Sequence, residues 1–131
     1  MATTTFIVLL ALLQYLVFVG LTGAARARGG VAAPACTGDE AFERWFRVQQ
    51  NTLEQLVVFV PAMFILGNLA AGHPLYTAIP GLAFLLGRAL YARAYVRDPK
   101  TRGPGMLLTL LANAALVGGA LVLAVVGWLR A

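Results

Sequence analysis

Charged side chains are scarce in this sequence of 131 residues. Only 11% of the residues are charged, whereas 60% are hydrophobic, and the mean hydropathy is +0.81. A soluble domain of this size needs more charge to stay in water. The composition therefore argues against a soluble protein and predicts one integral membrane domain over residues 1–131.

Residue types that bind metals or form disulfides are also nearly absent. The one cysteine, Cys36, lies in a Gly/Ala/Pro-rich stretch without an evident base nearby, so we expect neither an intrachain disulfide nor a catalytic thiol. The one histidine, His73, lies between a glycine and a proline and is expected to be a turn residue. No second His or Cys is placed to complete a metal site with it, so no metal is expected.

Acidic residues are few: five Asp and Glu stand against ten Lys and Arg, which gives a net charge of +5. A basic protein raises the question of nucleic acid. However, no run of basic residues with interleaved aromatic residues is present, so no nucleic-acid partner is expected. In a membrane protein, positive charge on the loops sets the orientation of the helices.

Long stretches with little or no charge predict four membrane-spanning helices. The first, Thr5–Ala25, contains no charge in 21 residues, enough to cross a hydrocarbon core of about 30 Å at about 1.5 Å per residue. Asp39 or Thr37 is expected to cap the second helix, and Pro61 to kink it. Gly118 and Gly119 predict a close helix contact. The other three helices are expected at about 41–71, 75–96 and 106–128. The predicted fold is therefore all-α, an integral membrane four-helix bundle.

The basic residues predict how this bundle lies in the membrane. They flank the first and third connections, whereas the second connection, "AGHP", has none. By the positive-inside rule, the connections 1–2 and 3–4 face the cytoplasm and both termini face the other side.

Two polar stripes are expected at the cytoplasmic side of the bundle. On the second helix, Arg47, Asn51 and Glu54 share one face. On the third, Arg88, Tyr91 and Tyr95 do the same. One explanation is a structural ion pair between Glu54 and Arg88. The other is a pocket for a zwitterionic ligand with more than one carboxylate, which also accounts for the nearby polar residues Gln49 and Arg102.

The segment "FERWFRVQQNTLEQLVVF" resembles the family of membrane-associated proteins in eicosanoid and glutathione metabolism (MAPEG), of microsomal glutathione transferase type. The segment "GRALYARAYVRDPKTRGPG" resembles the end of that family's third helix and the start of its fourth. The resemblance implies a homotrimer that binds glutathione between neighbouring subunits near the cytoplasmic face. Its glutathione-binding residues would be Arg47, Asn51, Glu54, Tyr91 and Tyr95, with Gln49 and Arg26 as further candidates.

The resemblance further implies that Arg102 stabilises the glutathione thiolate, which attacks a hydrophobic electrophile arriving from the bilayer. Peroxidase activity on lipid hydroperoxides is a variant of this chemistry. Two departures stand out: Gln55 replaces a tyrosine that some members carry beside the glutamate, and the first connection has two separated arginines, Arg26 and Arg28. The alternative is a non-catalytic trimeric membrane protein that binds a small thiol or a lipid.

Overall fold

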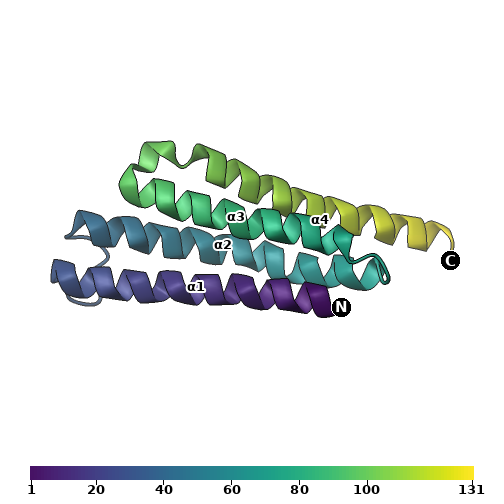
Figure 1. Ribbon diagram of the computed structural model, residues 1–131, viewed down its shortest axis with the longest axis horizontal. Coiled ribbons are helices and arrows are strands. Elements are labelled where there is room, and N and C mark those ends of the chain that lie inside the picture. Colours follow the sequence, from purple (N-terminus) through teal and green to yellow (C-terminus); the bar gives the residue numbers. More distant parts are fainter.

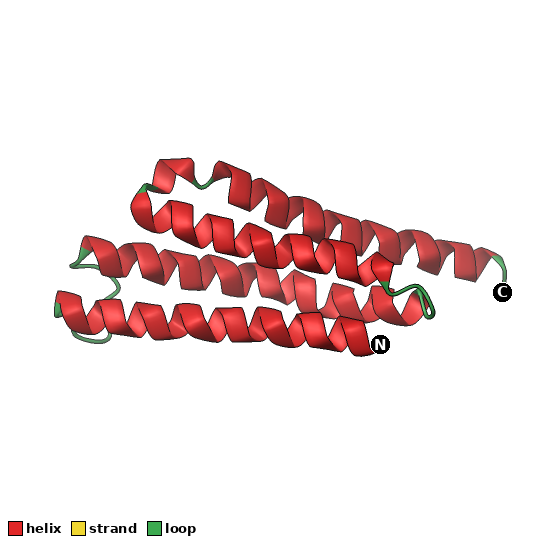
Figure 2. Cartoon of the chain, in the orientation of Figure 1, coloured by secondary structure: helices red, strands yellow, loops and turns green.

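The computed structural model describes all 131 residues as a bundle of four long helices without strands (Figure 1, Figure 2). Each long helix is long and apolar enough to cross a membrane, which confirms the predicted all-α membrane fold. Both termini lie at one end of the bundle, and the first and third connections lie at the other (Figure 1). The elements are α1 (Ala2–Gly29), α2 (Glu40–Leu69), α3 (Leu75–Arg97), the short 3₁₀ helix η1 (Pro99–Thr101) and α4 (Gly103–Leu129).

The helix ends follow from local capping. Helix α1 runs past its two arginines and ends because Gly30 adopts a left-handed conformation, with φ of 63°. Helix α2 begins after Asp39, whose Oδ2 accepts a hydrogen bond of 2.9 Å from the backbone N–H of Phe42. Asp39, and not Thr37, is thus the cap. The helix continues through Pro61 to Leu69.

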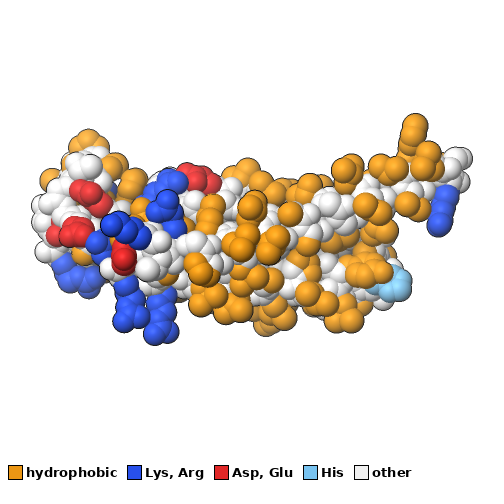
Figure 3. Space-filling model, turned by 90° about the horizontal axis from the view of Figure 1, so that it is seen from above, with side chains coloured by type: hydrophobic (Ala, Val, Ile, Leu, Met, Phe, Trp, Pro, Cys, Tyr) orange, Lys and Arg blue, Asp and Glu red, His pale blue; other side chains and the backbone are white.

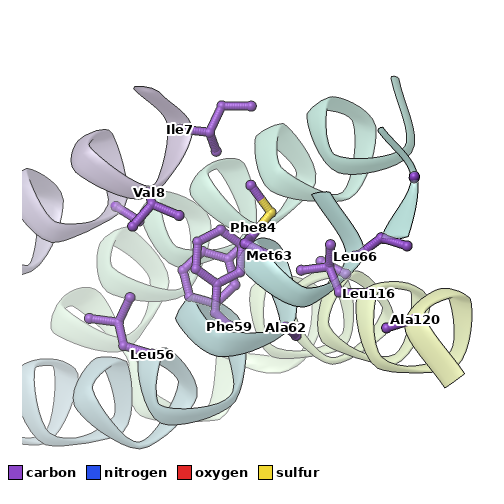
Figure 4. Packing of buried hydrophobic residues seen from close by; sticks show 13 residues of the cluster. Ile7, Val8, Leu56, Phe59, Ala62, Met63, Leu66, Phe84, Leu116 and Ala120 are labelled. Atoms are coloured by element: carbon purple, nitrogen blue, oxygen red, sulfur yellow. The ribbon is translucent and has the colours of Figure 1, made fainter. Parts of the chain in front are cut away.

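The apolar core lies in the half of the bundle away from the first and third connections (Figure 4). The rings of Phe59 on α2 and Phe84 on α3 stack at its centre, with centroids 3.8 Å apart. Met63 and Leu66 continue the same face of α2, and Leu116 joins them from α4 (Figure 4). Each of these side chains is almost fully buried, so the helices are tightly packed here.

Helices α3 and α4 approach each other closely where two glycines face each other. A Cβ atom on Gly105 would lie 2.3 Å from the backbone nitrogen of Tyr91, and one on Gly87 would lie 2.9 Å from the backbone nitrogen of Thr109. At Gly118 and Gly119, where a close contact was expected, Gly118 faces open space and a Cβ on Gly119 would make only an ordinary contact of 3.5 Å with the Leu66 side chain. The crossing of α3 and α4 instead brings Tyr91 next to the start of α4.

Charge and apolar surface are separated along the bundle (Figure 3). Acidic and most basic side chains gather at the end with the first and third connections, and apolar side chains cover the middle (Figure 3). Large apolar side chains on all four long helices are exposed, among them Phe6, Val57, Ile79 and Leu121. Such a belt suits contact with lipid rather than water.

Candidate functional site

The polar face of α2 forms as its helical spacing predicts. Arg47 Nη1 lies 3.3 Å from Glu54 Oε1, and Asn51 Nδ2 lies 3.4 Å from Glu54 Oε2. Asn51 is buried, but the side chains of Arg47 and Glu54 remain 49% and 54% exposed. The carboxylate thus has one cation and one amide beside it, and half of its surface is free to meet another group.

The polar face of α3 packs against this part of α2. The rings of Tyr91 and Tyr95 stack with centroids 5.4 Å apart. The guanidinium of Arg88 lies over Tyr91, 4.3 Å from the ring centroid, and its Nη2 donates a hydrogen bond of 3.0 Å to Thr52 Oγ1. Arg88 is fully buried. Its contacts hold Tyr91 in place against α2.

The ion pair between Glu54 and Arg88 is not formed within the chain. Glu54 pairs with Arg47, and Arg88 has no carboxylate within ion-pair distance. The Nε and Nη1 atoms of Arg88 are buried without a hydrogen-bond partner. Arg88 is therefore held by a hydroxyl and an aromatic face, and not by the carboxylate that its charge alone suggested.

A cavity of about 220 Å³ opens between these two faces and the start of α4. Arg102 reaches it from the turn between α3 and α4, where its Nη1 donates a hydrogen bond of 3.0 Å to the carbonyl oxygen of Pro99. Cations, a buried amide and two phenols thus surround one small space, which can bind carboxylates and stabilise an anion. The lining residues are Arg47, Asn51, Tyr91, Tyr95, Arg102 and Met106.

Three of the predicted glutathione-binding residues do not line this cavity: Glu54, Arg26 and Gln49. Glu54 lies beside it, in contact with the lining residues Arg47 and Asn51. Arg26 is directed to the first connection: its Nη1 donates a hydrogen bond of 2.7 Å to the carbonyl oxygen of Ala35, and its guanidinium lies 4.3 Å from the Phe42 ring centroid. Gln49 is half-buried and lies on a different side of α2 from Arg47 and Asn51. Neither residue belongs to the lining of the cavity within one chain.

Three features of the site were not apparent from the sequence. Met106 lines the cavity, one helical turn after Arg102. Thr52 accepts the hydrogen bond of Arg88. Gln55 Oε1 accepts a hydrogen bond of 3.0 Å from Asn113 Nδ2 on α4. The glutamine that stands in place of a tyrosine thus connects α2 to α4. Only Met106 could have been found by helical periodicity, since the other pairs depend on how the helices pack.

Comparison with known proteins agrees with this architecture. A model of the MAPEG family matches residues 3–122. The chain belongs to the MAPEG family. The match runs from the beginning of α1 into the second half of α4, so it includes every residue that lines the cavity.

Relatives of this MAPEG chain cover most of its length. An uncharacterized protein of Synechocystis sp. is 46% identical over 113 residues, which are 86% of this chain and 81% of the relative. Microsomal glutathione S-transferase 2 of Mus musculus is 34% identical over 84% of this chain and 77% of its own length. The Homo sapiens protein of the same name is 33% identical over 78% of this chain and 68% of its own length.

Proposed function

We propose that this protein is a membrane glutathione transferase that works as a homotrimer. The observation that carries the proposal is the cavity in which Arg47, Asn51, Tyr91, Tyr95 and Arg102 meet beside Glu54. Relatives named microsomal glutathione S-transferase 2 support the reaction class. Glutathione has an ammonium, two carboxylates and a thiol, and this set of side chains offers a partner to each.

A second copy of the chain would complete the site. The cavity of about 220 Å³ in one chain is smaller than the roughly 300–1,000 Å³ of ordinary ligand pockets. Glu54 is half-exposed in an apolar span of α2, where a carboxylate open to lipid is unfavourable. A neighbouring subunit at this face would enlarge the cavity and shield the carboxylate from lipid. Arg26 and Gln49 could take part from that subunit.

Each polar group of glutathione then has an assigned partner. Glu54 accepts the ammonium of the γ-glutamyl group in a charge-assisted hydrogen bond. Arg47, released from Glu54 by that ammonium, turns to a carboxylate of the ligand. Asn51 and the phenols of Tyr91 and Tyr95 bind the peptide and approach the sulfur. The charged end of the bundle, which holds this site, faces the cytoplasm.

Arg102 acts on the thiol. A guanidinium near the sulfur favours the thiolate over the thiol, because a nearby positive charge stabilises the anion. The thiol proton leaves to water at the charged end of the bundle. The thiolate then donates its electron pair to an electrophilic carbon of a hydrophobic substrate from the bilayer, and a thioether bond forms. The bond from that carbon to the leaving group breaks, and the leaving group departs with the electron pair, as chloride does from an activated aryl chloride.

Titration of the detergent-solubilised protein with glutathione tests this proposal. We expect binding by calorimetry together with an increase in ultraviolet absorbance due to the thiolate. Glutathione binding without thiolate formation would instead identify a non-catalytic binding protein. No binding at all would refute the assignment of the cavity.

A further inference from the structure

Arg44 of α2 makes a set of contacts that the proposed chemistry does not use. Its Nη1 donates hydrogen bonds of 3.0 Å to the carbonyl oxygen of Val96 and of 2.8 Å to that of Arg97. Its Nη2 pairs with the carboxylate of Glu40, one turn earlier on α2. The side chain of Arg44 is 25% exposed, so it is largely enclosed at the protein surface.

These contacts satisfy the end of α3. The last four carbonyl oxygens of a helix have no partner within the helix, and the helix dipole makes that end attractive to a cation. Arg44 binds the last two of these carbonyls. Ala94 is bonded locally: its oxygen accepts from the backbone N–H of Asp98 at 2.9 Å and from Thr101 Oγ1 at 3.3 Å.

Apart from its hydrogen bonds to Ala94, the turn that follows α3 is held by hydrogen bonds among its own residues. Asp98 Oδ1 accepts from the backbone N–H of Lys100 at 3.0 Å, and the Asp98 carbonyl oxygen accepts from Thr101 at 2.9 and 2.8 Å. Arg102 donates to Pro99 within the same turn. Arg44 therefore provides hydrogen bonds that connect the end of α3, from which this turn starts, to α2.

Two residues of the cavity lie on either side of the contacts that Arg44 makes. Tyr95 immediately precedes the carbonyls that Arg44 binds, and Arg102 lies at the far end of the turn. A second hollow, lined by Arg44, Arg47 and Tyr95 among others, adjoins the cavity and shares the last two residues with it. Arg44 thus lies just outside the cavity, where it connects the helix that bears Arg47 to the end of α3, from which the turn that bears Arg102 starts.

We propose that Arg44 is a positioning residue: it holds the turn between α3 and α4 against α2 and thereby sets the position of Arg102 relative to Arg47 and Asn51. This role rests on the proposed glutathione transferase function. The residues assigned to bind glutathione on α2 lie on the same helix as Arg44 and stay in place without it. Loss of Arg44 should therefore move the group that activates the thiol while leaving much of the binding site intact.

Kinetics of Arg44→Ala in detergent test the role, with chlorodinitrobenzene as electrophile. Because a misplacement of about 1 Å can cost about a hundredfold in rate, we expect kcat to fall by about ten- to a hundredfold, with less thiolate absorbance. The dissociation constant for glutathione should change little. Arg44→Lys keeps the positive charge but offers no guanidinium fork, so it should recover part of the rate. Arg93→Ala removes an exposed arginine of α3 and should behave as wild type.

Hydrogen–deuterium exchange of residues 95–106 measures the contact itself, without any ligand. Arg44→Ala should speed exchange there, since the backbone N–H groups of Asp98, Thr101 and Met106 are bonded within this region. Unchanged exchange, or an unchanged kcat in both Arg44 variants, would overturn the positioning role. A wild-type protein that binds no glutathione would overturn the proposed function, and the positioning role with it, whatever the exchange shows.

Discussion

Replacing Glu54 by glutamine tests the ligand assignment most directly, because the change removes the charge and keeps the size. In the proposed complex Glu54 accepts the ammonium of the γ-glutamyl group. The substitution should then weaken glutathione binding and spare the fold. If Glu54 is instead a structural residue, the fold should suffer and the ligand should not matter.

The structure gives a magnitude for each outcome. A hydrogen bond to a charged group contributes about 1.5–3 kcal/mol, or about 10- to 150-fold in the dissociation constant. Half-exposure of Glu54 in one chain favours the lower value, and burial between subunits favours the higher one. The contacts of Glu54 with Arg47 and Asn51 are long, at 3.3 and 3.4 Å. Such contacts contribute at most about 1 kcal/mol to stability, so the melting temperature should fall by no more than a few degrees.

A glutathione analogue without the α-amino group separates the two roles. Wild type should bind the analogue poorly by calorimetry, and Glu54→Gln should lose little further affinity for it. Glu43→Gln is the matched control: it removes an exposed carboxylate of the same helix, and a glutamine oxygen can still accept the 2.8 Å hydrogen bond from the backbone N–H of Gly38. Equal losses for both ligands, together with a large fall in melting temperature, would refute the assignment of Glu54.

Three further predictions follow from the site and the packing. Arg102→Ala should still bind glutathione but lose about ten- to a thousandfold in kcat, measured by steady-state kinetics and thiolate absorbance; an unchanged kcat would assign activation to Arg26 or Arg28. Gly105→Ala should unfold at a clearly lower temperature, because its Cβ would lie 2.3 Å from Tyr91 N, whereas Gly103→Ala, with open space around it, should not. Cross-linking in mild detergent should stop at three subunits, and a C-terminal label should lie outside the cytoplasm; a dominant dimer or a cytoplasmic label would contradict the proposed assembly and orientation.

The sequence predicted the number and approximate extent of the helices because runs without charge mark membrane spans directly. It placed the ends less well. Helix α1 was expected to end at Arg26 and Arg28, with Gly29–Gly30 as the break. It continues through both arginines to Gly29, so the left-handed Gly30 ends it and the charges do not. A close helix contact was expected at Gly118 and Gly119, but the closest backbone approach of α4 is at Gly105, because a glycine is needed only where a neighbouring backbone passes.

For the site, helical periodicity correctly brought Arg47, Asn51 and Glu54 together, since all three lie on one helix. Contacts between helices were harder to predict. Charge alone paired Glu54 with Arg88, but packing placed the guanidinium against Thr52 and Tyr91. Only the structure shows that Arg44 and Arg102 both bind carbonyl oxygens near the end of α3: Arg44 binds those of Val96 and Arg97, and Arg102 binds that of Pro99.

The missing charge in the turn between α2 and α3 has a consequence for membrane insertion. In the proposed orientation, with the charged end on the cytoplasmic side, the parts of the chain that cross are the two termini and residues 70–74. That turn carries no Lys, Arg, Asp or Glu, so α2 and α3 can pass through together as a hairpin. In the inverted orientation Arg26, Arg28 and the rest of the charged end would have to cross, at roughly 2.5–3.5 kcal/mol for each arginine at the bilayer centre. The charges around the candidate site would therefore also favour the proposed orientation over the inverted one.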